Sequence, residues 1–143
     1  MIDIRRVLVR AAVSTNTAVY RASKGRVMGK VRGAPVLLLT VAGRSTGKPR
    51  TTPLSYLPDG ERFVVTGSAG GSPHEPQWFQ NLRVADRAVI EVGDRRLDVD
   101  VKVADPAERA ALWARLVERS PFFANYQAKV EREIPMAVLS PRR

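Results

Sequence analysis

The loop GRSTGKPRTTPL, residues 43–54, contains the first residues of this sequence whose types and spacing could bind a ligand. Arg44, Lys48 and Arg50 lie close together between two apolar stretches, with a glycine on either side of two hydroxyl residues. Glycines allow a turn to aim backbone N–H groups inward, and arginine can hold phosphate or carboxylate through two parallel hydrogen bonds. The pattern predicts an anion-binding loop.

A second glycine-rich turn, residues 67–71, also follows a predicted strand. If neighbouring strands bring the two turns together, they form one polar cradle. Trp78 and Phe79 follow this turn, and Phe122 and Tyr126 come later in the chain. Core packing is the simpler interpretation of Phe79 and Phe122, whereas the Tyr126 phenol needs a hydrogen-bonding partner.

Several other chemistries are excluded by residue type. The chain has no cysteine and one histidine, His74, which argues against thiolate or histidine metal sites. No GxSxG surrounds a serine, and no GxGxxG is present. The 43–48 segment is one residue short of a P-loop, and Lys48 is followed by Pro49. Anion capture is the chemistry that remains.

The charge balance also predicts an anionic partner. The net charge is +10, and residues 1–33 hold eight Lys and Arg against one Asp. Nucleic acid, anionic lipid and a phosphorylated cofactor all fit this excess, and charge alone does not choose among them. No apolar run approaches the roughly 20 residues of a membrane span, and no secretory signal is present, so we expect a cytoplasmic protein.

Hydrophobic periodicity predicts an α+β domain. The predicted strands cover residues 34–43, 50–57, 62–66, 88–92, 95–103 and 134–139, and the predicted helices begin at Pro76, Asp105 and Pro121. Asp105 is predicted as the N-cap, with Pro106 in the first turn and Glu108 completing a capping box. Because strands and helices do not alternate in βαβ order, an antiparallel barrel or sandwich is favoured.

The chain divides into two predicted parts. Residues 1–33 form a basic amphipathic helix and connector, and residues 34–143 form the barrel domain. The helix either docks on the domain or contacts anionic lipid, and both interpretations stay open.

Several separate blocks resemble the deazaflavin-dependent nitroreductase and quinone reductase family. They are VLLLTVAGRSTGKPRTTPLSYLPDG, SAGGSPHEPQWFQNLR, SPFFANYQ and EREIPMAVL, and the resemblance runs from Tyr20 to Leu139. It implies a split β-barrel of the FMN-binding-like type, an antiparallel sheet with short flanking helices. It also implies that the cofactor is coenzyme F420, a 5-deazaflavin with a phosphate and a polyglutamate tail. Relatives with this fold are often homodimers.

The resemblance also assigns roles to residues of this chain. It implies a catalytic or hydrogen-bonding role for Tyr126 and substrate contacts from Phe123, Tyr126 and Trp78. The residues that it implies for binding the cofactor are Arg44, Ser45, Thr46, Lys48, Arg50, Thr51, Thr52, Pro53, Leu54, Ser55, Thr66, Gly67, Ser68, Ala69 and Trp78. No metal ligand is implied.

The sequence departs from the family pattern at three of these positions. Ser45 and Ala69 stand where relatives often have a cation, and Lys48 replaces one of these charges in part. Phe123 stands where some relatives have a second tyrosine, which leaves Tyr126 as the predicted donor. We therefore expect a weaker hold on the anionic tail than is usual in the family.

Together these observations predict an F420-dependent oxidoreductase. It would transfer a hydride from the reduced deazaflavin to a small-molecule acceptor, which is a quinone, an activated alkene or a nitroaromatic. A non-catalytic deazaflavin carrier and a basic membrane or nucleic-acid binding module are the alternatives. The preferred interpretation involves no nucleic acid and leaves open a peripheral membrane contact through the N-terminal segment.

Overall fold

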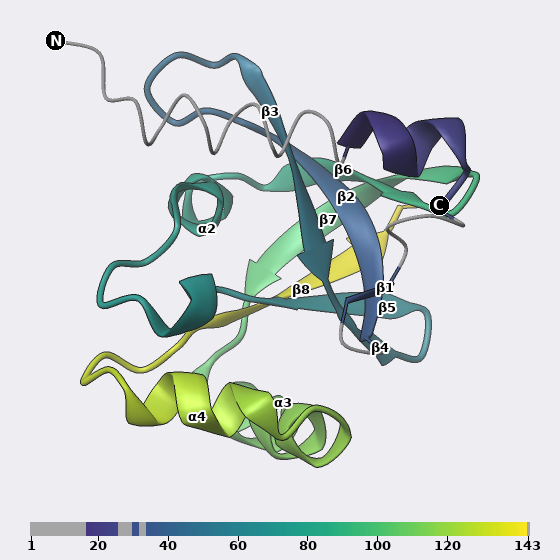
Figure 1. Cartoon of the computed structure of the whole chain (residues 1–143). Coiled ribbons are helices and arrows are strands. Elements are labelled where there is room, and N and C mark those ends of the chain that lie inside the picture. Colours follow the sequence, from purple (N-terminus) through teal and green to yellow (C-terminus); the bar gives the residue numbers. More distant parts are fainter. Residues whose placement is uncertain (1–16, 26–29, 32–33, 143) are drawn as a thin grey trace, which may run out of the picture.

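The computed structural model describes residues 17–25, 30–31 and 34–142, and its centre is one curved antiparallel sheet (Figure 1). The strands are β1 (Lys30–Val31), β2 (Ala34–Ala42), β3 (Pro49–Ser55), β4 (Leu57–Asp59), β5 (Arg62–Thr66), β6 (Arg87–Val92), β7 (Arg95–Val103) and β8 (Met136–Pro141). The helices are the short 3-10 helix η1 (Ala69–Gly71), α2 (Gln77–Arg83), α3 (Pro106–Arg119) and α4 (Phe122–Ala128). Residues 17–22 are helical as well. The predicted α+β class is confirmed.

The sheet closes on itself through one bent segment of chain. Its order is β1-β2-β6-β7-β8-β5-β4, and β3 pairs with β2. Only Tyr56 separates β3 from β4, so a continuous segment runs from the β2 side of the sheet to the β5 side. The Tyr56 amide donates to the Pro35 carbonyl at 3.0 Å, which fixes the bend against β2. The result is a curled, partly open barrel.

The barrel interior holds the main core. Alternate residues of β2, Leu37, Leu39 and Val41, point inward because side chains of a strand alternate between its faces. Phe79 and Leu82 of α2 complete this cluster and are almost fully buried. The core-packing interpretation of Phe79 is therefore confirmed.

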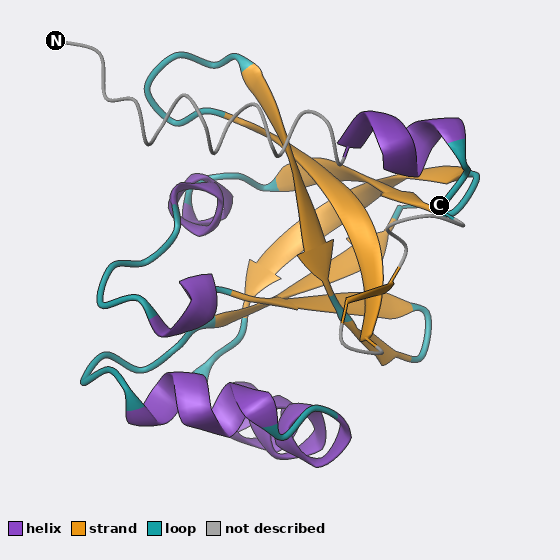
Figure 2. Cartoon of the chain, viewed as in Figure 1, coloured by secondary structure: helices purple, strands orange, loops and turns teal. Residues whose placement is uncertain are grey.

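A second core lies between the sheet and the α3–α4 pair, which covers one end of the barrel (Figure 2). Leu112 and Leu116 of α3 and Phe123 of α4 meet Val64 and Met136 of the sheet. The predicted N-cap of α3 is confirmed, because an Asp105 carboxylate oxygen accepts from the Glu108 amide at 2.8 Å. The Glu108 carboxylate lies instead 3.7 Å from Arg62 and 3.9 Å from Lys102, so this glutamate serves an ion-pair cluster.

Part of the N-terminal segment docks on the barrel. Tyr20 is buried against Val36 and Leu38 on the outer face of β2. Its hydroxyl donates to the Val36 carbonyl at 3.0 Å and accepts from the Gly93 amide at 2.8 Å. The predicted amphipathic helix around residues 4–12 lies outside the described residues, and the predicted domain boundary after residue 33 stays a prediction.

Candidate cofactor site

The β2–β3 loop is a closed turn that presents side chains. The Gly43 amide donates to the Lys48 carbonyl and the Gly47 amide donates to the Gly43 carbonyl, both at 2.8 Å. The Lys48 amide donates to the Thr46 hydroxyl at 3.2 Å. The amides of Gly43 and Gly47 are therefore used to close the turn and are not available to an anion, and the anion-binding role of the loop stays a prediction. The groups of the turn that are exposed to a ligand include the side chains of Ser45, Thr46 and Lys48.

Arg44 fastens this loop to α2. Its backbone amide and its Nη1 both donate to Oδ1 of Asn81, at 3.0 and 2.8 Å. Its Nη2 donates to the side-chain oxygens of Gln77 at 2.7 Å and Gln80 at 3.0 Å. All of these acceptors are neutral amides, so the guanidinium is held in place by groups that carry no compensating negative charge.

The cations of the loop have no carboxylate partner in the part of the chain that the structure describes. Within residues 17–25, 30–31 and 34–142, none of Arg44, Lys48 and Arg50 forms an ion pair. Other arginines of the chain are neutralised: Arg83 at the end of α2 forms hydrogen bonds to Glu75, which raise the pKa of Arg83. The loop therefore concentrates unneutralised positive charge on one side of the barrel, as an anion site requires.

The strand that follows the loop has one unpaired edge. Because Tyr56 donates to Pro35 and the β2–β3 register is unbroken, alternation of the ladder turns the backbone groups of Thr51, Pro53 and Ser55 away from β2. No described strand pairs with that edge. Proline is tolerated at 53 because no hydrogen bond to β2 is required there. The N–H groups of Thr51 and Ser55 therefore point away from β2, whereas the backbone groups of Thr52 and Leu54 pair with β2.

The glycine turn follows β5 and is packed tightly on both sides. A side chain at Gly67 would place its Cβ 2.9 Å from the Phe79 ring, and one at Gly71 would lie 3.2 Å from Cα of Tyr126. Gly71 also has a φ of 83°, and Ala69 adopts a φ of 47°, which is unfavourable for a residue with a side chain. The turn is thus wedged between α2 and α4, with Ser68 buried and Ala69 exposed.

The aromatic residues predicted to contact the ring and the substrate have different environments. Trp78 is half-buried and packs edge-on against Phe79, with ring centroids 5.4 Å apart. Tyr126 is half-buried, lies edge-on to Phe122 and Phe123, and has Lys129 Nζ 5.8 Å from its ring centroid. Phe123 is only 5% exposed in the α3–α4 core. Substrate contact through Phe123 stays a prediction, and its position makes it a support for Tyr126.

The structure gathers most of the predicted residues on one side of the barrel. The β2–β3 loop, α2, η1 and α4 lie along that side (Figure 1). Helix α2 connects the β2–β3 loop with the glycine turn. Its Asn81 accepts hydrogen bonds from Arg44 of the loop, and its Phe79 packs on Gly67 of the turn. Asn81 was not predicted as a site residue, and it is only 6% exposed. The signal in the sequence is a polar residue between the apolar positions Phe79 and Leu82 of a predicted helix.

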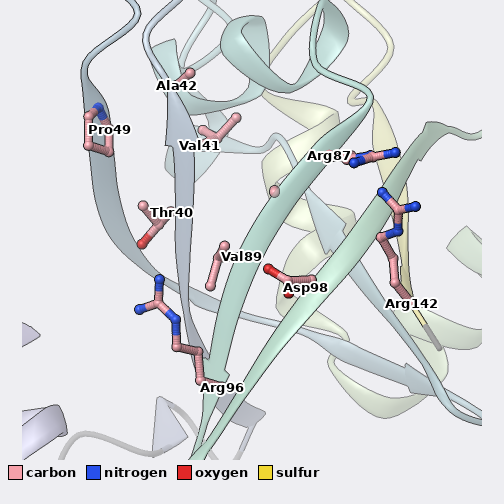
Figure 3. Close-up of a pocket in the computed structure, with 10 residues that line it drawn as sticks. Thr40, Val41, Ala42, Pro49, Arg87, Val89, Arg96, Asp98 and Arg142 are labelled. Carbon is pink, nitrogen blue, oxygen red and sulfur yellow. The ribbon is translucent and has the colours of Figure 1, made fainter.

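A separate groove of about 720 Å³ lies on the outer face of the sheet (Figure 3). Its lining includes Arg87, Arg96, Asp98 and Arg142, and Thr40 contributes to its floor. None of the predicted site residues lines this groove. The predicted cofactor site and the groove are therefore different regions of the protein.

Solved structures place this architecture among reductases. The F420-H2 dependent reductase FDR-A has a TM-score of 0.68 and 31% identity, and the match covers 74% of this chain and 94% of that one. The predicted split β-barrel is confirmed. By its fold, the chain belongs to the split-barrel proteins.

The sequence comparisons define the family. The model of the F420H(2)-dependent quinone reductase family matches residues 12–141, and the chain belongs to that family. The F420H(2)-dependent quinone reductase Rv1261c of Mycobacterium tuberculosis is 38% identical over 129 residues, which cover 87% of each chain. The predictions of this family, of an oxidoreductase and of F420 as the family's cofactor are confirmed.

Two further findings concern assembly and membranes. A solved structure described as a domain-swapped dimer has a TM-score of 0.71 and 28% identity, and covers 95% of this chain and 99% of its own. Among the described residues, no helix has the length and apolar character to cross a membrane. A homodimer and a peripheral contact of residues 1–33 with anionic lipid stay predictions for this chain.

Proposed function

We propose that this protein binds reduced coenzyme F420 and transfers a hydride to a quinone, with activated alkenes and nitroaromatics as further acceptors. Membership of the F420H(2)-dependent quinone reductase family supports the proposal. The structural observation that carries it is the β2–β3 loop: neutral amides of α2 hold Arg44, and Arg44, Lys48 and Arg50 have no carboxylate partner in the described part of the chain.

The residues present fit the chemistry of this coenzyme. Its phosphate and polyglutamate tail is a polyanion, and Arg44, Lys48 and Arg50 supply compensating charge. The N–H groups of Thr51 and Ser55 on the unpaired edge of β3 add donors that do not depend on side-chain identity. We assign the binding of the tail to the loop and the β3 edge.

The ring and the acceptor belong beside the glycine turn and α4. Trp78 offers a half-buried aromatic surface next to the turn, and the Tyr126 helix contacts Gly71. Bound in its reduced form, the coenzyme supplies the hydride. Tyr126 donates a hydrogen bond to the acceptor oxygen, which stabilises the negative charge that develops there. The protein thus provides position and electrostatic stabilisation.

A fluorescence titration with coenzyme F420 tests the first step. We expect Arg50→Ala to raise the Kd about tenfold, because it removes a charge-assisted contact. Arg119→Ala, which removes an exposed arginine at the end of α3, is the matched control and should leave the Kd within about twofold. Absence of coenzyme binding, or equal binding by Arg50→Ala, would contradict the proposal.

Turnover with menadione, an enone and a nitroaromatic tests the second step. Tyr126→Phe should lower kcat at least about tenfold and leave the Kd of the coenzyme nearly unchanged, since the hydroxyl acts on the acceptor. Binding without turnover of any acceptor would instead favour the non-catalytic carrier.

A further inference from the structure

Arg132 is bound to the glycine turn through backbone carbonyls. Its Nη2 donates to the carbonyls of Gly67 at 3.1 Å and Ser68 at 3.2 Å, and its Nε donates to the Ser72 carbonyl at 3.1 Å. The His74 carbonyl lies 3.5 Å from the same Nη2. The guanidinium forms no ion pair within the described residues, and its Nη1 is buried there without a hydrogen-bond partner. Arg132 therefore holds the turn through carbonyl groups, and no carboxylate of the described residues forms an ion pair with it.

These contacts set the direction of the peptide groups in the turn. In a planar trans peptide, the C=O and the following N–H point in opposite directions. With the Gly67 and Ser68 carbonyls directed at Arg132, the amides of Ser68 and Ala69 are directed away from it. Because Ala69 has a φ of 47°, the turn adopts a conformation that its own residues disfavour. Arg132 supplies external contacts that hold this conformation.

The same arginine is tied to α4. Nε2 of Gln127 donates to the Arg132 carbonyl at 2.8 Å, and Oε1 of Gln127 accepts from the Ile134 amide at 2.9 Å and from Arg109 at 3.2 Å. Gln127 adjoins Tyr126 on α4. The hydrogen bonds of Arg132 and Gln127 therefore fix the glycine turn relative to the helix that carries the proposed catalytic tyrosine.

We propose that Arg132 is a positioning residue of the cofactor site. It orients the Ser68 and Ala69 peptide groups toward the coenzyme and places a positive charge behind the turn, where Ala69 supplies none. Nothing in the family assignment gives Arg132 this role. The inference rests on the proposed function only in naming coenzyme F420 as the ligand, because the hold on the turn exists without it.

The experiment compares Arg132→Met and Arg132→Lys with Arg115→Met in the full chain. Arg115 is the control, because it also donates to a carbonyl, that of Pro58 at 3.1 Å. It belongs to α3, and its side chain reaches the β4–β5 hairpin, where it also binds the Asp59 carboxylate. We expect Arg132→Met to raise the Kd of coenzyme F420 about tenfold and Arg132→Lys about threefold, while Arg115→Met stays within about twofold. The KM for menadione should change less than the Kd of the coenzyme.

Hydrogen exchange of the ligand-free protein provides a readout that does not need the coenzyme. The amides of Gly71 and Ser72 donate within the turn, to the Ser68 and Ala69 carbonyls. We expect both to exchange faster in Arg132→Met and to be unchanged in Arg115→Met. If Arg132→Met does not fold, Arg132→Lys provides the same comparison.

Two outcomes would overturn the inference. Unchanged exchange in a folded variant would show that Arg132 does not hold the turn. Faster exchange with an unchanged Kd would show a structural role that does not reach the cofactor. If the wild-type protein binds no coenzyme, the proposed function fails, and unchanged or faster exchange then decides separately whether Arg132 orients the turn.

Discussion

Arginines at two regions of the molecule are held by different kinds of oxygen. On the side of the predicted site, Arg44 and Arg132 donate to neutral amide and carbonyl oxygens. At the β4–β5 hairpin, Arg62 and Arg115 share the Asp59 carboxylate, the latter at 2.7 Å. Hydrogen bonding fixes the side chain in both regions. Only the first arrangement leaves the positive charge available to a ligand.

We therefore expect the arginines at Asp59 to stabilise the fold and those at the predicted site to bind a ligand. Hydrogen bonds from Arg115 and Arg62 lower the pKa of Asp59, so the folded state prefers the charged carboxylate. At the site, repulsion among Arg44, Lys48 and Arg50 is a small cost because these side chains are exposed to water and salt. An anionic ligand would remove that repulsion.

The largest expected effect comes from removing a cation that neutral amides hold. Arg44→Met should raise the Kd of coenzyme F420 by about 10- to 100-fold, corresponding to the roughly 1.5–3 kcal/mol of a hydrogen bond to a charged group. Arg62→Met should lower the melting temperature and leave the Kd unchanged. Fluorescence titration and thermal unfolding of both variants measure the contrast. Equal Kd values for the two variants would remove the distinction between the regions.

Removal of the shared carboxylate should act on stability alone. Asp59→Asn should lower the free energy of unfolding by about 1–2 kcal/mol at pH 7, because Arg62 and Arg115 lose a charged acceptor. Since the folded-state pKa of Asp59 lies below the ordinary 3.8, this stability is present above pH ~4 and is lost as the pH falls through the folded-state pKa.

Urea unfolding at several pH values follows this difference. Asp98→Asn is the control, because Asp98 forms no ion pair in the described part of the chain and should show no comparable loss. A deficit of Asp59→Asn that persists unchanged at low pH would mean that the carboxylate is not its source.

The smallest expected effect comes from adding a cation to the site. Ala69→Lys should lower the Kd of coenzyme F420 about threefold, since Ala69 is exposed on the glycine turn and an exposed charge pair contributes at most about 1 kcal/mol. Ala110→Lys on the exposed face of α3 adds the same charge elsewhere. If both variants bind equally well, total charge rather than position controls affinity.

Patterns within short stretches of sequence predicted the hairpin and helix start that depend on those stretches alone. The alternation around Gly93 predicted the β6–β7 hairpin, and Asp105 predicted the start of α3. The last strand begins at Met136, two residues later than predicted, because the Ile134 amide and carbonyl bind the side chains of Gln127 and Arg109. Such a contact depends on the packing of distant segments and leaves no local pattern.

In the candidate site, too, features with a local sequence signal were predicted, and contacts between distant segments were not. Composition and the family resemblance identified the cationic loop and the glycine turn. The partners that hold them, Asn81 for Arg44 and Arg132 for the turn, come from segments distant in sequence. Arg132 lies among charged neighbours in EREIP, where nothing in the pattern distinguishes it from a solvated side chain.

The position of β8 between β5 and β7 has a consequence for biosynthesis. Translation delivers β5 early, but the strand that pairs with its second edge follows only after α2, the β6–β7 hairpin, α3 and α4. Until then the apolar β5 strand, Arg62–Thr66, presents an unpaired edge that could recruit another nascent chain. We expect slow translation between β5 and β8 to favour aggregation, and a chaperone that shields strand edges to improve the yield of folded protein.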